Sequence, residues 1–274
     1  SRHRIFNRYI KKIPFVFLQH GVIALKRVDN FYGKGKKGGC DLFVVSTNKE
    51  KQTIVENFEY EPDEVINTGL PRWDVLKDKS QGKREILIMP TWRNWLDSVP
   101  DKDFEESDYF RHYMGLLNSE RLNQILEKYD LEVNFYLHAK FQEYADTFKS
   151  ISKRIHLISF GEVAVNEMLM RCRMLITDYS SVCWDILYQD KPSLFYQFDI
   201  GKYNEAHGSY IDMETELFGD RAATQEQLLD YLEETVQNDF RLKPEYEKMR
   251  GEYLQFKDHE HSRHICEEIK KRFH

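Results

Sequence analysis

Short apolar runs alternate with segments of helical spacing along most of the 274-residue chain. Apolar runs bounded by turn residues predict buried strands, and apolar residues three and four positions apart predict helices that cover them. Strands are expected at residues 13–18, 42–45, 64–67, 85–89, 131–137, 155–158, 174–176 and 193–196. Helices are expected at residues 48–58, 111–128, 145–151, 163–171, 182–188, 225–238 and 244–271. The alternation predicts an α/β protein with parallel sheets covered on both faces.

Three stretches lack either pattern. Residues 22–39 are rich in glycine and lysine and predict a loop, and residues 101–107 are acidic and predict a mobile loop. Residues 69–83 run from LPRWD to KDKSQGK, a composition typical of an interdomain linker. We therefore expect residues 1–75 to form one unit, the remainder of an N-terminal domain, and residues 84–274 to form a second.

Polar side chains follow four of the predicted strands directly. They are His20, the segment Thr91–Arg93, His138 and the turn Thr177–Ser181. In parallel sheets covered by helices, ligands bind outside the carboxyl ends of the strands. These four positions therefore predict where a ligand is bound.

Residues 174–192, MLITDYSSVCWDILYQDKP, carry the strongest local signal. A short buried strand ends at the polar turn Thr177–Ser181, and a helix opens immediately afterwards. The first turn of a helix has unpaired N–H groups and the positive end of the dipole, and Ser180 and Ser181 add hydroxyl donors. This geometry is typical of anion binding. The alternative is that Asp178 or one of the serines only caps the helix.

Two histidines are candidates for acid–base chemistry. His20 lies between a strand and Gly21, and a histidine at a strand end can act as a general base at neutral pH. The alternative is that it only ties down the strand end. His138 lies in YLHAK, where it can donate a hydrogen bond to a phosphate oxygen, with Lys140 as a nearby cation. The alternative for His138 is an ordinary solvent-edge histidine.

Two arginines and one acid are further candidates. Arg93 follows a predicted strand, and a guanidinium gives planar, bidentate recognition of phosphate. Arg72 offers the same chemistry from the linker, or it pairs with Asp74 and fixes the hinge. We favour Arg93 as the phosphate ligand and a structural role for Arg72. Asp185 lies one turn into the helix after Ser181 and either bonds a ribose hydroxyl or faces solvent.

Composition narrows the class of protein. With 41% hydrophobic and 31% charged residues, the chain is typical of a soluble globular protein. The formal net charge of −6 gives no case for a nucleic-acid partner. The first forty residues are nevertheless basic, which suits either a solvated face or contact with a polyanionic acceptor or a phospholipid surface.

Several common sites are absent from the sequence. The four cysteines are scattered, which fits a reducing compartment with neither disulfides nor a zinc site. No apolar run approaches the ~20 residues of a transmembrane helix, and no signal-peptide pattern is present. P-loop and HExxH patterns are missing. The GxGxxG spacing at 33–38 and the Asp-x-Asp spacing at 101–103 lie within predicted loops and not directly after a predicted strand, so no cofactor and no metal is expected. The charge of a phosphate ligand would then be met by the helix dipole, hydroxyls, arginine and histidine.

Six ordered motifs carry a resemblance to a known family. They are LQHG at 18–21, TGLPRWD at 68–74, PTWR at 90–93, His138, TDYSS at 177–181 with Asp185 and Lys191-Pro192, and FYQFD at 195–199. In this order they resemble the CDP-glycerol glycerophosphotransferase family of teichoic-acid synthesis. The resemblance implies a GT-B-like fold of two facing Rossmann-type domains, the second of which binds the CDP donor. It also implies that most of an N-terminal half is absent from this chain.

The resemblance assigns roles to the candidate residues. It places His20 at the catalytic histidine of the family and His138 beside it in catalysis, with Ala139 where relatives commonly have proline. It implies donor contacts for Arg93, Thr177, Asp178, Ser180, Ser181 and Asp185. A polar cluster is expected at the glycerol end of the substrate: Asp199, Tyr203, His207 and Asp212. Val22 and Ile23 differ from the usual hydroxyl and proline, which leaves acceptor specificity open.

The implied activity is transfer of glycerol phosphate, or a related polyol phosphate, from a CDP-activated donor to an anionic polymer or lipid-linked acceptor, with release of CMP. The expected location is the cytoplasm, peripherally at the inner face of the cell membrane. One alternative is a GT-B glycosyltransferase or epimerase that uses a UDP-sugar. The other is a non-catalytic module that binds a nucleotide or an anionic polymer.

Overall fold

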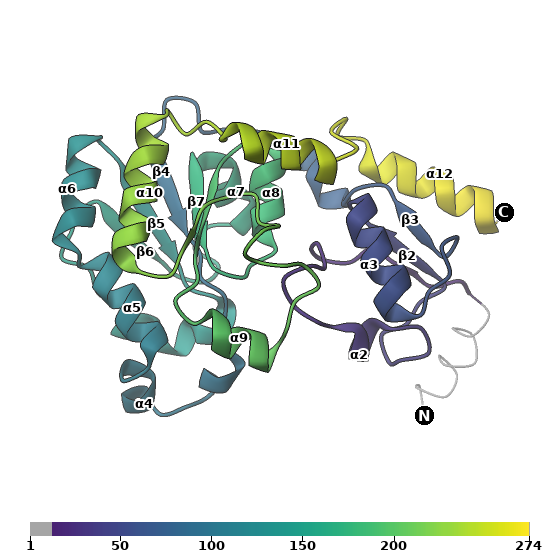
Figure 1. The fold of residues 1–274 in the computed structure, drawn as a ribbon, viewed down its shortest axis with the longest axis horizontal. Coiled ribbons are helices and arrows are strands. Elements are labelled where there is room, and N and C mark those ends of the chain that lie inside the picture. The colour runs from purple at the N-terminus through teal and green to yellow at the C-terminus, as the bar shows by residue number, and fades with distance from the viewer. Residues whose placement is uncertain (1–12, 274) are drawn as a thin grey trace. The chain divides into compact units, whose positions relative to one another are not determined.

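The structure, a computed structural model, describes residues 13–273 and divides into two compact units (Figure 1). Of the described residues, the first unit contains 13–75, 207–211 and 248–273, and the second contains 76–206 and 212–247. Each unit has its own parallel sheet and its own apolar core.

The first unit is built on a parallel sheet with the strand order β1-β2-β3. Successive side chains of β2 point to opposite faces, so each face packs against a different helix. Phe43 and Val45 contact α3, whereas Leu42 and Val44 contact Ile265 of α12. The elements of this unit are β1 (Val16–Phe17), α2 (Asp29–Tyr32), β2 (Leu42–Val45), α3 (Asn48–Phe58), β3 (Val65–Asn67), the 3₁₀ helix η1 (Pro71–Val75), α11 (Pro244–Tyr253, from residue 248 on) and α12 (His261–Phe273).

Helix α3 has clear start and stop signals. The side chain of Thr47 caps its first turn by accepting a hydrogen bond from the backbone N–H of Glu50 at 2.9 Å. The helix ends at Glu59, which adopts the left-handed conformation (φ 63°) that commonly terminates helices. The cap fixes the backbone of Glu50, which is the third residue of the helix.

The second unit contains a six-stranded sheet of order β6-β5-β4-β7-β8-β9, in which every neighbouring pair is parallel. The chain builds outward from β4 through β5 to β6 and then returns to the other side of β4 with β7. The strand order therefore reverses between β4 and β7, and ligands in such sheets bind at this point. The strands are β4 (Glu85–Ile88), β5 (Glu132–Tyr136), β6 (Ile155–Ile158), β7 (Met174–Thr177), β8 (Ser193–Tyr196) and β9 (Arg221–Ala222).

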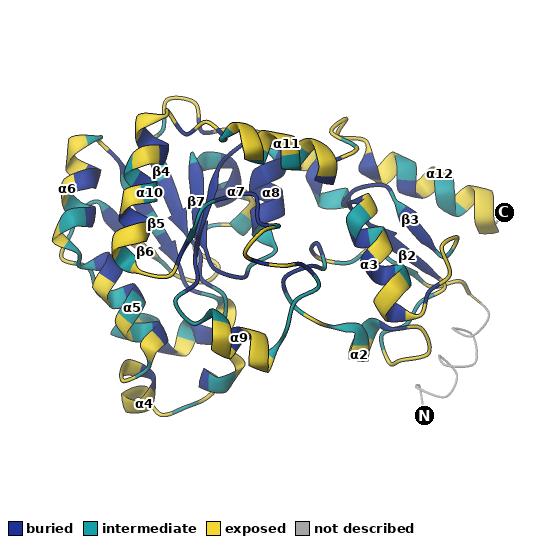
Figure 2. Ribbon diagram, in the orientation of Figure 1, coloured by how far each residue is buried: buried dark blue, intermediate teal, exposed yellow. Residues whose placement is uncertain are grey.

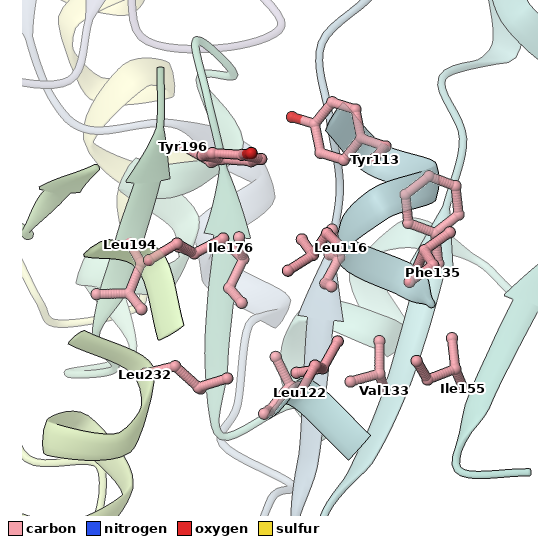
Figure 3. Close-up of a cluster of buried hydrophobic side chains, with 14 of the residues drawn as sticks. Tyr113, Leu116, Leu122, Val133, Phe135, Ile155, Ile176, Leu194, Tyr196 and Leu232 are labelled. Carbon is pink, nitrogen blue, oxygen red and sulfur yellow. The ribbon is translucent and has the colours of Figure 1, made fainter. Parts of the chain in front are cut away.

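Helices cover both faces of this sheet (Figure 1). On one face α5, α6 and α10 bury Leu116, Leu122 and Leu232 against alternate strand residues such as Val133 and Ile176 (Figure 3). On the other face lie α7 and α8, and the central strands are buried between the two layers (Figure 2). The helices are α4 (Asp101–Glu105), α5 (Asp108–Leu117), α6 (Glu120–Lys128), α7 (Val165–Arg171), α8 (Val182–Tyr188), α9 (Ile200–Ala206) and α10 (Gln225–Gln237), with 3₁₀ helices η2 (Asn94–Leu96) and η3 (Ala139–Thr147).

Three expected elements differ from the sequence prediction in the second unit. The helix expected at 145–151 is instead the 3₁₀ helix η3, which spans Ala139–Thr147. The helix expected at 111–128 is broken at Asn118, because Ser119 starts a new helix by accepting a hydrogen bond from the N–H of Leu122. The loop expected at 101–107 contains α4, which is held by the fully buried Phe104 stacked on Tyr144 at 3.9 Å. The acidic composition of residues 101–107 predicted a loop because it gave no weight to Phe104, the one buried residue of this helix.

The C-terminal segment also differs from the prediction. The helix expected at 244–271 is two helices, α11 and α12. Residues 248–273 belong to the first unit, whereas they were expected in the second. The reason is that Ile265 and Ile269 supply the apolar cover for one face of the β1-β2-β3 sheet. No helix among residues 13–273 is long and apolar enough to cross a membrane.

Candidate functional site

The ends of β4 and β7 are tied together at the point where the strand order reverses. The hydroxyl of Thr177 donates to the backbone oxygen of Met89 at 2.7 Å, and the N–H of Thr91 donates to the carboxylate of Asp178 at 2.8 Å. Both Thr177 and Asp178 are buried. These two side chains therefore hold the loops after β4 and β7 in place, and their polar atoms face protein groups.

Arg93 sits at the centre of this region with no exposed surface. Its guanidinium forms a bidentate pair with Asp199, at 2.7 and 3.0 Å, and contacts Asp178 at 2.8 Å. A further N–H donates to the backbone oxygen of Thr91. The role expected for Arg93, a direct ligand of phosphate, is not what this geometry supports, because two carboxylates and a carbonyl occupy its donors. Burial opposes the charge, but the two carboxylates outweigh it and hold the pKa of Arg93 well above its usual value.

Aromatic residues surround this ion pair. Tyr179 donates a hydrogen bond to Asp199 at 3.0 Å and stacks on Tyr203 with ring centroids 3.6 Å apart. Tyr113 of α5 donates to Asp178 at 3.2 Å. Burial and the neighbouring carboxylates raise the pKa of Tyr179 and Tyr113, so both stay protonated donors. We call Arg93, Asp178, Asp199, Tyr113 and Tyr179 the arginine node.

The two serines of the turn are the candidate residues left for a ligand. Both Ser180 and Ser181 are partly exposed. Ser181 precedes α8 without making a side-chain capping hydrogen bond. The Ser180 hydroxyl lies 3.5 Å from the backbone nitrogen of Val182, which is long for a hydrogen bond. Plain capping therefore explains these hydroxyls poorly. Asp185, in the same helix, is buried, so the solvent-facing alternative for it is wrong.

His138 lies just beyond β5 and caps η3. Its Nδ1 accepts a hydrogen bond from the N–H of Lys140 at 3.1 Å, which places the proton of the neutral ring on Nε2. The ring lies roughly parallel to that of Trp92, with centroids 6.4 Å apart, and the ammonium of Lys140 lies 5.6 Å from the Trp92 ring. His138, Trp92 and Lys140 thus share one edge of the sheet with the Thr91–Arg93 segment.

His20 belongs to the first unit, in an exposed turn after β1. Its backbone oxygen accepts a hydrogen bond from Arg72. Asp74 accepts hydrogen bonds from the N–H groups of His261 and Ser262, at 2.7 and 2.9 Å, and so caps α12. Arg72 thus supports the turn that carries His20, and Asp74 caps α12.

The residues of the expected polar cluster after β8 belong to different elements and to both units. Asp199 and Tyr203 lie at the arginine node. His207 belongs to the first unit, and the Asp212 carboxylate closes a turn by accepting from the N–H of Glu214 and the hydroxyl of Thr215. Asp199 is therefore a partner of Arg93, and Tyr203 lies nearby, stacked on Tyr179.

Three residues that hold the backbone in place were missed by the sequence analysis. Gln197, inside FYQFD, donates to the backbone oxygen of Asp178 at 2.9 Å. Lys191, inside the Lys-Pro motif, is buried and donates to the backbone oxygens of Leu169 and Met170 at the end of α7. The motifs were visible, but only the three-dimensional contacts show that these two residues shape the fold. Glu50 was also missed, although Thr47-x-x-Glu50 has the spacing of a capping box.

The strand order and the polar loops at its reversal define the second unit as a Rossmann-type α/β unit of the kind that binds nucleotides. The chain belongs to the family described as CDP-Glycerol:Poly(glycerophosphate) glycerophosphotransferase, which matches residues 4–271. The family resemblance seen in the sequence is thereby confirmed.

Curated relatives agree with this assignment. The chain is 30% identical over 270 residues to the minor teichoic acid biosynthesis protein GgaB of Bacillus subtilis, covering 93% of this chain and 29% of GgaB. It is 26% identical to a teichoic acid glycerol-phosphate transferase of Staphylococcus aureus, covering 84% of this chain and 60% of that protein. The chain thus spans less than two thirds of either relative.

Two solved structures establish the fold class. The wall teichoic acid polymerase TagF superimposes with a TM-score of 0.68 at 19% identity, over 93% of this chain and 68% of that chain. A Staphylococcus aureus MnaA structure with UDP gives a TM-score of 0.57 at 14% identity, over 96% of this chain and 69% of that chain. The predicted α/β, GT-B-like fold with parallel sheets is confirmed.

Proposed function

We propose that this chain transfers glycerol phosphate, or a related polyol phosphate, from a CDP-activated donor to a poly(glycerol phosphate) or teichoic-acid-like acceptor. The observation that carries the proposal is the turn Ser180–Ser181, which opens α8 at the reversal of the strand order in a member of this family. Backbone N–H groups and hydroxyls there suit a diphosphate.

In this reaction the terminal hydroxyl oxygen of the acceptor attacks the phosphorus that carries the glycerol. A new P–O bond forms, the P–O bond to CMP breaks, and CMP leaves with the bonding electrons. His20 takes the proton of the attacking hydroxyl as general base. Phosphoryl transfer depends mainly on positioning and on electrostatic stabilisation of the phosphate oxygens.

The diphosphate ligands in this proposal are Ser180, Ser181 and His138. The Nε2–H of His138 supplies a hydrogen bond to an oxygen of the leaving CMP, which is the part we give this residue in catalysis. Asp185 is proposed to bind a ribose hydroxyl. Arg93, Thr177 and Asp178 act through the backbone that they hold, because their polar groups are bound to protein atoms.

A UDP-sugar site is the second candidate function, and the likeness of the fold to MnaA with UDP is the observation that favours it. A thermal-shift panel of CDP-glycerol, CDP-ribitol, CMP and UDP-N-acetylglucosamine separates the two. We expect the cytidine compounds to raise the melting temperature and the UDP-sugar to leave it unchanged. The reverse order would favour the second candidate.

The catalytic role is tested with His20→Ala. The rate of CMP release from CDP-glycerol, measured with an oligo(glycerol phosphate) acceptor, should fall by about 10²–10⁴ because the base is lost. The dissociation constant for CDP-glycerol should change little, since a base contributes to the transition state. Near-normal transfer by the folded variant would remove His20 from the mechanism.

Location at the inner face of the cell membrane is part of the same proposal. Lys36 and Lys37 of the first unit are exposed. Such basic residues would bind the phosphates of a polymer acceptor or of a lipid-linked one. Most of the basic N-terminal segment that suggested this contact lies outside the described residues. Co-sedimentation with anionic vesicles, compared with neutral ones, tests the membrane contact.

A further inference from the structure

Glu50 is a buried carboxylate in the first unit that the proposed chemistry does not use. Only 3% of its surface is exposed. Its Oε1 accepts hydrogen bonds from the side chain of Gln19 at 2.9 Å and the N–H of Ile23 at 2.6 Å. Its Oε2 accepts from the N–H and the hydroxyl of Ser46, at 2.7 and 2.6 Å. A buried carboxylate with four donors around it is costly to replace.

The four hydrogen bonds join two strand ends. Gln19 and Ile23 lie on either side of His20 and Gly21, in the turn after β1. Ser46 follows β2 directly. Glu50 therefore fastens the turn that carries His20 to the end of the central strand of this sheet.

The turn is held in a conformation that it would not adopt easily alone. Gln19 has a φ of 39°, in the left-handed region, which costs free energy for a residue other than glycine. The side chain of this same residue bonds to Glu50. Arg72 reaches the backbone oxygen of His20 from η1. Glu50 and Arg72 thus hold the turn through separate atoms.

We propose that Glu50 is a positioning residue for His20: it fixes the turn so that the imidazole is presented in the geometry that proton transfer requires. This inference rests on the proposed function, in which His20 is the general base. A carboxylate suits the task because it only accepts hydrogen bonds, and the groups around it donate. In Glu50→Gln the new amide NH₂ would face donors and lose at least one bond.

The kinetic test compares three variants of the purified protein. Glu50→Gln and Glu50→Ala should lower kcat for CMP release from CDP-glycerol by about 10- to 100-fold, since a misplacement of about 1 Å has this size of effect. The KM for CDP-glycerol should stay within about twofold of wild type. Glu50→Asp should restore part of the rate, because it keeps an acceptor-only group.

Glu64→Gln is the matched control. Glu64 is another acid of the first unit that ties down a loop, through the ammonium of Lys34 at 2.6 Å and the N–H of Glu61 at 2.9 Å. It does not contact the turn that carries His20. Its variant should keep the wild-type kcat even if its melting temperature falls. An equal loss of kcat in Glu64→Gln and Glu50→Gln would overturn the proposal.

A second readout does not depend on catalysis. The imidazole signals of ¹⁵N-histidine-labelled protein can be assigned for His20 by their loss in His20→Ala. In Glu50→Gln we expect the His20 signal to shift or broaden, while the other histidine signals stay in place. An unmoved His20 signal together with a wild-type kcat would show that Glu50 only stabilises the fold. If wild type releases no CMP, the proposed function fails, and the His20 signal alone decides whether Glu50 positions this ring.

Discussion

At the scale of single residues, Arg93 shows how burial decides what a charged group does. Its position after β4 was predicted from the sequence, but its role was not. The sequence does not show whether an arginine binds a phosphate or pairs with two carboxylates of the protein. The partners, Asp178 and Asp199, are 85 and 106 residues away and reach Arg93 only through the strand order β4-β7-β8. Local spacing contains no such information.

Replacing Arg93 with alanine should lower the free energy of unfolding, and this loss should be larger than any direct effect on CDP-glycerol affinity. Removal leaves Asp178 and Asp199 without their buried partner, which typically destabilises by about 3–5 kcal/mol. Urea unfolding measures this loss. The control is Arg111→Ala, because Arg111 is 65% exposed in its ion pair and should change stability by less than about 1 kcal/mol. If Arg93→Ala kept wild-type stability and lost CDP-glycerol binding, Arg93 would be a direct phosphate ligand after all.

The serines of the turn should behave in the opposite way. Ser180→Ala and Ser181→Ala should each weaken CDP-glycerol binding, because a hydrogen bond to a charged phosphate is worth about 1.5–3 kcal/mol. Their unfolding free energy should hardly change, since Ser181 does not cap α8. Isothermal titration calorimetry measures the affinity.

Ser119→Ala provides the comparison for these serines. Ser119 caps α6 through the N–H of Leu122, so its loss should lower stability by about 1 kcal/mol and leave donor binding unchanged. If the turn serines behaved like Ser119, they would be helix caps and the phosphate would bind elsewhere.

At the scale of elements, the sequence was most informative where strong periodicity met a clear boundary. The strands 42–45, 155–158 and 193–196 and the helices 48–58 and 182–188 were predicted with the bounds that the structure has. It was least informative where a helix stops and restarts without a change of period, as at Asn118. A capping serine inside an amphipathic stretch is ambiguous, because serine is also tolerated within helices.

The start of α12 gives a pH-dependent prediction. Burial opposes ionisation of Asp74, but hydrogen bonds from Ser262 and the N–H of His261 outweigh it and lower its pKa below the usual 3.8. A carboxyl whose pKa is depressed on folding stabilises the folded state above its unfolded pKa, and this contribution is lost as pH falls through the folded pKa. Asp74→Asn should therefore melt below wild type at pH 7, and the difference should shrink under acid conditions.

Melting curves between pH 7 and pH 3 test this prediction. The exposed Asp103→Asn, at the start of α4, is a suitable comparison and should follow wild type throughout. A gap between Asp74→Asn and wild type that stays constant with pH would mean that the charge of Asp74 does not support α12.

At the scale of the whole molecule, alternation of strands and helices was enough to predict parallel α/β units. The strand order was not accessible, because it depends on which strands pair across crossovers of unknown direction. The family resemblance supplied the class of fold, and the contacts of Arg93 corrected the role that it had implied for this residue.

The donor site is predicted to work without a metal ion. The polar groups offered at the turn are hydroxyls and N–H donors, and Asp101-Lys102-Asp103, which has Asp-x-Asp spacing, lies in the exposed first turn of α4. CDP-glycerol affinity should therefore be the same with excess chelator and with magnesium. The exposed Asp258 and Glu260, with the partly buried His264, are a separate place where an ion could bind, so His264→Ala is the control for any magnesium effect. Affinity that is lost with chelator and restored by magnesium in His264→Ala as well would contradict the prediction.

The first unit is made of three separate segments of the chain, which affects where a fragment for expression should begin and end. An expressed fragment that starts at residue 76 and runs to the end would carry α12 without the strands that it covers. Ile265 and Ile269 would then lie open to water, and such a fragment should aggregate. Ending the fragment at residue 247 removes that liability and keeps all six strands of the larger sheet. The boundary that matters for obtaining the second unit alone is thus near its C-terminal end, far from the linker that the composition suggests.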